Sequence, residues 1–420
     1  MPIRVSILSK AAFQGGAARA AYRIHRALRQ IGVDSRMLVD VAPEDDWTVA
    51  SPSHNWWRNG PALLRFVQSL LRRQRATTNP VIHSPAVMPS RWPSYLNASD
   101  ADIIHLQWVN GEMLSIADIG KLEKPVVWTL HDMWPFCGAE HYTEEYRWQE
   151  GYGQSNRPGY ESGFDLNKWT WNRKRKHWKK PVQLVAPSHW LAQCVSQSSL
   201  MQDWPVTVVP NAIDTEFWRP MERNQAREFL DLPKENSILL FGALGAGHDP
   251  RKGFDLLLEA IGYLRGERKD LRLVVFGQSK PKSPPDLGFP IHYFGHLHDD
   301  LSLRLLYCAS DAMVIPSRLD NLPNTGLEAL ACSTPVVSFN VGGLPDIVVH
   351  KRSGYLAKAF DTQDLATGIA WVLDQSLVDL PGSVASTKYG WLEESARERA
   401  VAQFSYPVVA EQYLNVYRKI

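Results

Sequence analysis

The 420-residue chain has few cysteines, little net charge and no long apolar segment. A formal net charge of +2 gives no global signal for binding nucleic acid, and we expect none. The four cysteines have neither the spacing of a metal site nor that of a disulfide framework, which is typical of a protein of the reducing cytosol. They are Cys137, Cys194, Cys308 and Cys332.

No apolar stretch approaches the length that is needed to span a bilayer. The N-terminal run over residues 3–9 is too short for a signal peptide and instead predicts a first β-strand. We therefore expect a cytoplasmic protein, with at most a peripheral contact to the inner face of the plasma membrane.

Strand-like and helix-like runs alternate along the chain, which predicts an α/β protein with parallel sheets. A turn rich in Pro, Asn and Asp near residues 209–214 separates two such series. We predict an N-terminal domain over 1–209, a C-terminal domain over 210–390 and two terminal helices, separated at Pro407, over 391–420. The predicted strands are 3–9, 102–107, 126–131, 182–186, 206–209, 238–242, 272–276 and 311–315, and the main helices are 17–31, 254–265, 301–308 and 325–332.

Two acidic residues, Asp320 and Glu328, lie eight positions apart around a turn rich in Asn, Pro, Thr and Gly. Because a strand is predicted before this turn and a helix after it, a ligand there would meet backbone N–H groups at a helix N-terminus. Such groups favour phosphate, and nearby carboxylates accept hydrogen bonds from sugar hydroxyls. The segment therefore predicts a nucleotide-sugar site, with the backbone of Asn324, Thr325 and Gly326 near the phosphates.

A structural explanation of Glu328 remains open at this point. The run Thr325-Gly-Leu-Glu328 also fits a capping box, in which Thr325 caps the helix and Glu328 accepts from the Thr325 N–H. In that case Glu328 would support the helix rather than a ligand.

The whole segment resembles the signature of the retaining glycosyltransferases of family 4. That signature has two acids separated by seven residues, a small-residue helix, a strand and a Gly-Gly-Pro-type loop, here Asp320…Glu328, Pro335–Ser338 and Gly342–Asp346. The resemblance covers most of the chain and is strongest over 235–375. It implies the GT-B fold, in which two Rossmann-like, doubly wound parallel-sheet domains face a central cleft and a terminal helix crosses back onto the first domain.

The resemblance also implies roles for the acids and for a group of other residues. Glu328 would bind the donor ribose and Asp320 the donor sugar, although the family usually has Glu at the first position. His131, at the end of a predicted strand, would position the sugar, and Asp132 could orient it. The loop of Gly15 and Gly16 would face the diphosphate and sugar, and the backbone of Gly295 and Leu297 would line the nucleobase pocket.

Two cations, Arg251 and Lys252, precede the predicted helix over 254–265. A leaving nucleoside diphosphate gains negative charge as the glycosidic bond breaks, so a cation there stabilises the transition state more than the ground state. By resemblance, Lys252 supplies the main cation. Its usual arginine partner, six residues earlier, is replaced by Ala246, a role that Arg251 either takes or leaves empty. The alternative is that Arg251 and Lys252 are both solvated charges beside a helix start.

Two basic segments in the first half of the chain each have two possible interpretations. The first combines an apolar stripe with arginines between Arg58 and Arg75, and the second, Lys168–Lys180, mixes seven Lys or Arg with three tryptophans. Each is either a solvated face or a docking surface for anionic lipid or a lipid-diphosphate acceptor. Tryptophans such as Trp134 and Trp148 could stack on acceptor sugars or fill the core.

We therefore predict an enzyme that transfers a sugar from a UDP- or GDP-linked donor to an acceptor hydroxyl, with retention of configuration. The acceptor would be a saccharide or a lipid-linked saccharide, in polysaccharide or glycolipid assembly. No cofactor or metal is expected, since no Asp-x-Asp motif lies at a strand end. The alternatives are a nucleotide-sugar epimerase of the same fold and an inactive binding or scaffold protein.

Overall fold

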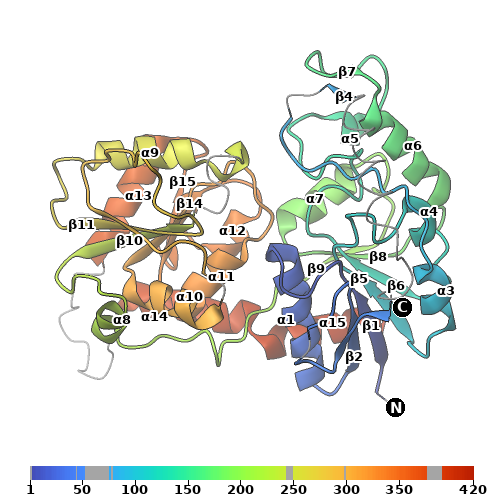
Figure 1. The fold of residues 1–420 in the computed structure, drawn as a ribbon, viewed down its shortest axis with the longest axis horizontal. Coiled ribbons are helices and arrows are strands. Elements are labelled where there is room, and N and C mark those ends of the chain that lie inside the picture. The colour runs from blue at the N-terminus through green and yellow to red at the C-terminus, as the bar shows by residue number, and fades with distance from the viewer. Residues whose placement is uncertain are drawn as a thin grey trace. The chain divides into compact units, whose positions relative to one another are not determined.

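A computed structural model describes residues 2–43, 45–52, 75–76, 79–242, 249–297, 299–375 and 390–420. Ala246 and the predicted apolar stripe with its arginines, apart from the backbone of Arg75, lie outside these residues. The chain divides into two compact units, Met1–Ala212 with Val409–Ile420, and Ile213–Val408. Each unit contains a large parallel sheet with helices around it, so the prediction of two doubly wound α/β domains is confirmed (Figure 1).

The first unit is built on a seven-stranded parallel sheet with the order β3-β2-β1-β5-β6-β8-β9. Its central strands β1 and β5 are almost continuously buried, as expected when helices cover both faces of a parallel sheet. The strands are β1 (Arg4–Leu8), β2 (Asp34–Leu38), β3 (Val49–Ala50), β5 (Ile103–Leu106), β6 (Val126–Thr129), β8 (Gln183–Ala186) and β9 (Val206–Val208). The helices are α1 (Gly16–Gln30), α3 (Trp92–Ala98), α4 (Ile116–Ile119), α5 (Arg147–Glu150), α6 (Leu166–His177) and α7 (His189–Gln197), and β4 (Arg75–Ala76) pairs with β7 (Ser162–Gly163).

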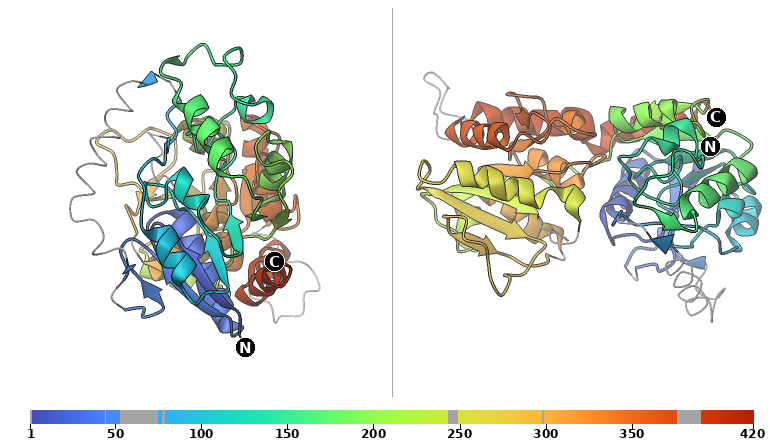
Figure 2. Two further views of the ribbon diagram at one scale, coloured as in Figure 1. Left: turned by 90° about the vertical axis from the view of Figure 1, so that its right-hand side faces the viewer. Right: turned by 90° about the horizontal axis from the view of Figure 1, so that it is seen from above.

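The second unit contains a six-stranded parallel sheet with the order β12-β11-β10-β13-β14-β15. Two apolar clusters pack on this sheet: one includes α9 and α13, and the other α10, α11 and most of α14 (Figure 2). The strands are β10 (Ser237–Gly242), β11 (Leu271–Phe276), β12 (Ile291–Tyr293), β13 (Ala312–Ile315), β14 (Val336–Phe339) and β15 (Gly354–Ala357). The helices are α8 (Arg223–Phe229), α9 (Phe254–Tyr263), α10 (Asp300–Ala309), α11 (Asn324–Ala331), α12 (Leu344–Ile347), α13 (Thr362–Gln375) and α14 (Trp391–Phe404).

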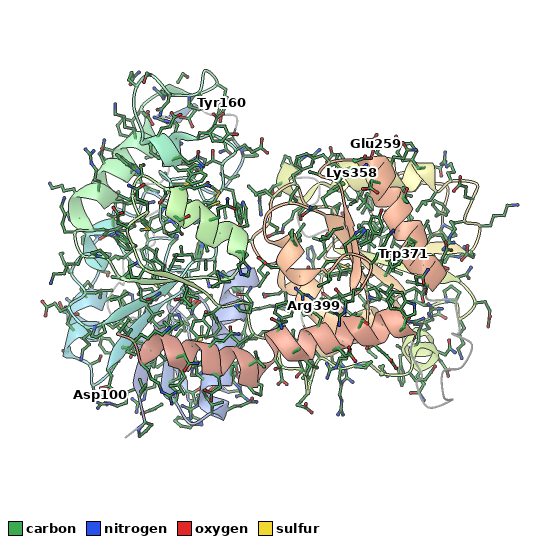
Figure 3. All side chains as sticks on the ribbon, turned by 180° about the vertical axis from the view of Figure 1, so that it is seen from behind. Asp100, Tyr160, Glu259, Lys358, Trp371 and Arg399 are labelled. Carbon is green, nitrogen blue, oxygen red and sulfur yellow. The ribbon has the colours of Figure 1, made fainter. Side chains whose placement is uncertain are left out.

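The two terminal helices, α14 and α15 (Tyr406–Tyr417), are separated at Ser405. Pro407 falls in the first turn of α15, where its missing N–H has no intrahelical partner to lose. The guanidinium of Arg399, labelled in Figure 3, donates to the backbone carbonyls of Asp346 and Ile347 and so fastens α14 to α12. From Val409 onward α15 belongs to the first unit, where its tyrosines are buried. No helix within the described ranges is long and apolar enough to cross a membrane.

Candidate functional site

Two neighbouring loops of the second unit carry the predicted cationic and acidic residues. One contains a single 3-10 turn, Pro250–Lys252, before α9, and the other joins β13 to α11. Gly253 joins the turn to α9 with φ of 65°, and a Cβ there would lie 2.0 Å from the carbonyl oxygen of Pro316. Only glycine therefore lets the two loops approach this closely.

Lys252 and Asp320 meet at this contact. The Lys252 Nζ donates to Asp320 Oδ2 at 2.6 Å, and Ser317 Oγ donates to the same oxygen at 3.2 Å. Burial alone would raise the pKa of Asp320, but the charges of Lys252 and Arg251 and these hydrogen bonds hold its pKa below the usual value. Asp320 is therefore an ionised, nearly buried carboxylate that fixes a partly exposed ammonium group.

Arg251 is held by the protein rather than extended into solvent. Its guanidinium donates to the Leu319 carbonyl at 3.0 Å and to Asp249 at 2.9 Å, and lies 3.9 Å from Asp320. Its charge therefore acts on Asp320 and helps to shape the loop. The interpretation of Arg251 as a solvated charge is wrong.

Arg318 joins the same two loops and was not singled out from the sequence. Its guanidinium donates to both oxygens of Asp255, on α9, at 2.7 and 2.5 Å, and to the Pro250 carbonyl at 2.9 Å. Its backbone N–H donates to the Arg251 carbonyl at 2.7 Å. Arg318 thus sets the spacing between the segments that carry Lys252 and Asp320. In the sequence, only the place of Arg318 two residues before Asp320 indicates this role.

Glu328 does not take part in a capping box. Helix α11 begins at Asn324 after Pro323, and no side chain caps it. Glu328 is buried, and its Oε2 accepts from the hydroxyl of Tyr307, on α10, at 2.9 Å. The capping-box interpretation is therefore wrong, because the helix starts two residues earlier than the motif requires.

The start of α11 was predicted to offer backbone N–H groups to phosphate. The Gly326 N–H donates to the Pro323 carbonyl at 3.1 Å, so it is already engaged within the turn. A Cβ on Gly326 would contact Ile347 and Ile315 at 3.0 and 3.1 Å, which explains the glycine by packing. Asn324 and Thr325 occupy the first two positions of the helix.

The loop of Gly342 and Gly343 contacts the backbone carbonyl of Asp320. Gly343 N–H donates to the Asp320 carbonyl at 3.0 Å. Gly342 has φ of 54°, and a Cβ there would lie 2.3 Å from the same carbonyl oxygen. The backbone of Asp320 therefore depends on a glycine at this position.

Gly342→Ala is expected to lower the melting temperature by several degrees more than Gly266→Ala. Both glycines have positive φ, but a Cβ at Gly266 would meet nothing within 4 Å, so the control reports the backbone penalty alone. Thermal unfolding followed by circular dichroism measures both variants. Equal shifts would mean that the loop of Asp320 tolerates the added methyl group.

Gly295 and Leu297 follow strand β12 in the second unit. Gly295 has φ of 66°, and its carbonyl accepts from the Gly277 N–H, so the loop is tied to the end of β11. Leu297 packs against the apolar cluster that contains α10. Both residues lie in the loop after β12, whose parallel neighbour is β11, and their role toward a nucleobase stays a prediction.

The remaining predicted residues lie in the first unit, after the carboxyl ends of two strands. Gly15 precedes α1 with φ of 91°, and Gly16 is the first residue of that helix. His131 follows β6, and its Nε2 lies 2.7 Å from Gln107 Oε1. Burial lowers the pKa of His131 to about 4, so its imidazole is neutral near pH 7.

Asp132 does not orient His131. Its Oδ2 lies 2.6 Å from His141 Nδ1 and accepts from Trp108 Nε1 at 3.0 Å, while His141 Nε2 lies 2.8 Å from Ser84 Oγ. Gln107, which the sequence analysis does not single out, contacts the His131 ring.

The basic segment Lys168–Lys180 is only partly a surface. Lys174 is fully buried: its ammonium donates to the carbonyls of Trp134, Cys137 and Gly138 and lies 3.9 Å from the Trp134 ring centroid. Burial lowers its pKa to about 7. Trp171, Trp178, Trp134 and Trp148 are also buried and fill the core. The solvated-face interpretation is therefore wrong for Lys174, while Arg175, Lys176, Lys179 and Lys180 are exposed, as both the solvated face and the docking surface require.

Sequence profiles divide the chain in the same way as the fold. The profile described as Glycosyltransferase Family 4 matches residues 14–217, and that described as Glycosyl transferases group 1 matches residues 235–375. Together they include the loop of Gly15 and Gly16, His131, and the loops of Lys252 and Asp320. The chain belongs to glycosyltransferase family 4.

Known proteins agree with this assignment. The D-inositol 3-phosphate glycosyltransferase 2 of Catenulispora acidiphila is 32% identical over 212 residues, which are 46% of this chain and 48% of that protein. The chain spans about half the length of the curated relatives that it matches.

Solved structures of GT-B glycosyltransferases share the fold of the whole chain. Sucrose-phosphate synthase from Thermosynechococcus elongatus aligns with a TM-score of 0.63 at 17% identity, over 99% of this chain and 98% of that one. Anabaena HepE in complex with UDP-glucose aligns with a TM-score of 0.60 at 14% identity, over all of both chains. At these identities the likeness shows the fold, which is GT-B.

Proposed function

We propose that this family 4 protein transfers a sugar from a nucleotide-diphosphate donor, UDP- or GDP-linked, to an acceptor hydroxyl with retention of configuration. The observation that carries the proposal is the contact between Lys252 and the buried, ionised Asp320. An ammonium group has three donors, so Lys252 can keep Asp320 and still donate to a diphosphate oxygen. Asp320 would then bind a donor-sugar hydroxyl through its remaining lone pairs.

In the proposed reaction the bond between the anomeric carbon and the diphosphate oxygen breaks as the acceptor oxygen bonds to the same face of that carbon. The acceptor's proton passes to the departing diphosphate, and Lys252 stabilises the charge that develops there. Glu328 binds the ribose hydroxyls, and the start of α11 lies near the phosphates. The roles of Gly15, Gly16 and His131 toward the donor, and of Gly295 and Leu297 toward the base, are part of the proposal. No residue in this scheme requires a metal ion.

The direct test is a melt-shift screen against UDP, GDP, ADP and TDP, followed by an assay of nucleoside diphosphate release from the matching donor sugars. We expect one nucleotide to stabilise the protein and its donor to be consumed only when a saccharide or lipid-linked saccharide is added. Isomerisation of the donor without an acceptor would support an epimerase instead. Donor binding without turnover across the acceptor panel would support a binding protein.

The setting of the reaction is proposed from chemistry alone. The exposed cations of the segment Lys168–Lys180 suit an anionic surface, such as a membrane that holds a lipid-linked acceptor. Replacing Arg175, Lys176, Lys179 and Lys180 together by glutamine is expected to weaken sedimentation with vesicles rich in anionic lipid. Wild-type protein that shows no preference for anionic over neutral vesicles would remove membrane contact from the proposal.

A further inference from the structure

A ladder of polar side chains runs across one face of the first unit's sheet. His105 and Gln107 alternate along β5 and its extension, and Thr129 and His131 alternate along the neighbouring β6. In the parallel register His105 pairs with Val127, so Thr129 lies one step further, level with Gln107. Alternate residues of a strand point to one face, so these four side chains share it. Polar residues on a buried face are costly unless they are hydrogen-bonded.

Helix α15 completes the ladder. Its residues Tyr413 and Tyr417, one helical turn apart, are buried against the sheet. The Tyr417 hydroxyl lies 2.7 Å from His105 Nδ1, and the Tyr413 hydroxyl lies 3.0 Å from Thr129 Oγ1. The terminal helix therefore reaches the strand that leads to His131 through specific hydrogen bonds as well as through packing.

Gln107 links the two histidines. Its Oε1 lies 2.7 Å from His131 Nε2, and its Nε2 lies 2.9 Å from His105 Nε2. An amide oxygen only accepts and an amide nitrogen only donates, so His131 carries its hydrogen on Nε2 and His105 carries its hydrogen on Nδ1. His105 Nε2 then also accepts from the Thr129 hydroxyl at 2.8 Å, and Thr129 Oγ1 in turn accepts from the Tyr413 hydroxyl.

The charge state of the ladder fits this arrangement. Burial lowers the pKa of His105 to about 3 and that of His131 to about 4, and the neighbouring charge of Asp132 only partly opposes the second shift. Both rings are therefore neutral at physiological pH, and each has one donor and one acceptor nitrogen.

We propose that Gln107, anchored through His105 to Tyr417 of the terminal helix, is a positioning residue that fixes His131 as the Nε2–H tautomer. The Nδ1 of His131 is then an acceptor, suited to a sugar hydroxyl of the donor. The fixed end of this chain of hydrogen bonds is α15, so a helix some 300 residues away in sequence orients the imidazole. This inference rests on the proposed function only in its choice of a sugar hydroxyl as the ligand of His131.

Long-range ¹H–¹⁵N correlation spectra of full-length protein, labelled with ¹⁵N at histidine, test the tautomer without any substrate. His131 is assigned by comparison with His131→Ala. The expected wild-type pattern is a neutral Nε2–H ring, and Gln107→Leu is expected to release it into tautomer exchange. Tyr417→Phe removes the hydroxyl at the other end of the chain, and its matched control is Tyr152→Phe, since Tyr152 is an equally buried tyrosine of the same unit whose hydroxyl contacts Glu140 and Gly138 instead. A wild-type Nδ1–H tautomer would overturn the proposal.

Activity of the same variants tests the consequence. Gln107→Leu is expected to lower kcat/KM about tenfold, the scale of one lost hydrogen bond, and Tyr417→Phe to lower it less. Gln107→Glu places a carboxylate against Nε2 and raises the pKa of His131, so activity should fall at acidic pH and recover at alkaline pH. A flat profile for Gln107→Glu, or wild-type kcat/KM in Gln107→Leu, would contradict the role of Gln107, and wild-type kcat/KM in Tyr417→Phe would remove the helix from it. If wild-type protein turns over no donor while the tautomers are as expected, the proposed function fails and the ladder stands.

Discussion

Replacing Lys252 by alanine is expected to lower turnover by at least about a hundredfold, the scale of one lost electrostatic contact to a transition state. The ammonium group lies 2.6 Å from Asp320 Oδ2 and is partly exposed, so it can reach a ligand. Its removal also leaves a nearly buried carboxylate without its closest cation. The release of nucleoside diphosphate, measured under saturating donor, gives the effect on kcat.

The matched control is Lys358→Ala, which removes an exposed lysine of the same unit (Figure 3). It should leave turnover at the wild-type level, because the net charge changes equally but the site does not. Lys252→Arg, which keeps a cation, should recover only part of the activity because a planar guanidinium replaces a point charge. Wild-type turnover in a folded Lys252→Ala protein would contradict the assignment of Lys252.

Glu328→Ala is expected to weaken donor binding by about 10- to 100-fold, since a hydrogen bond to a charged group contributes roughly 1.5–3 kcal/mol. Because the structure rules out a capping box, the loss cannot be attributed to an uncapped helix. Calorimetric titration with the donor measures the affinity, and a thermal melt checks that the protein is folded.

Tyr307→Phe separates the two functions of the carboxylate. It removes the hydroxyl that donates to Glu328 Oε2 and keeps the ring in the core. We expect a smaller loss of donor affinity than in Glu328→Ala, because the carboxylate remains. If both variants lose the same affinity, Glu328 acts through Tyr307 rather than through the ribose. If Glu328→Ala binds donor as the wild type does, Glu328 is structural.

The strand, turn and helix around Asp320 could be predicted from the sequence because they depend on local patterns. The run before Asp320 is apolar and the run after it is helical, and the structure has β13 and α11 there within one residue of the predicted bounds. Alternation of such runs is sufficient to predict two parallel sheets. The capping-box interpretation also rested on a local pattern, and it is wrong because a four-residue motif does not fix where a helix begins.

Contacts between distant segments could not be predicted from these patterns. Arg318 reaches Asp255 and Tyr307 reaches Glu328, and nothing in their neighbouring residues marks either pair. Lys174 looked like one cation of a basic run, but three backbone carbonyls from residues 134–138 surround its ammonium group. A charge run indicates exposure only when no other segment supplies acceptors.

The sequence indicates part of the polar ladder of the first unit. His105-x-Gln107 and Thr129-x-His131 alternate with apolar residues in two predicted strands, and Tyr413 and Tyr417 are four apart in a predicted helix. Which strands are neighbours, and which helix covers them, follows only from the sheet order. Because the sheet order makes the two strands neighbours, the two strand patterns and the helix pattern form one chain of hydrogen bonds.

The central claim is that the loops of Lys252, Asp320 and Glu328 bind a nucleotide-diphosphate sugar. Its most direct test is calorimetric titration of the donor class chosen by the melt-shift screen into wild-type protein, Lys252→Ala, Glu328→Ala and Lys358→Ala. We expect tight binding to the wild type and Lys358→Ala and clearly weaker binding to the other two. Equal affinity in all four proteins, or no binding to the wild type by any donor, would contradict it.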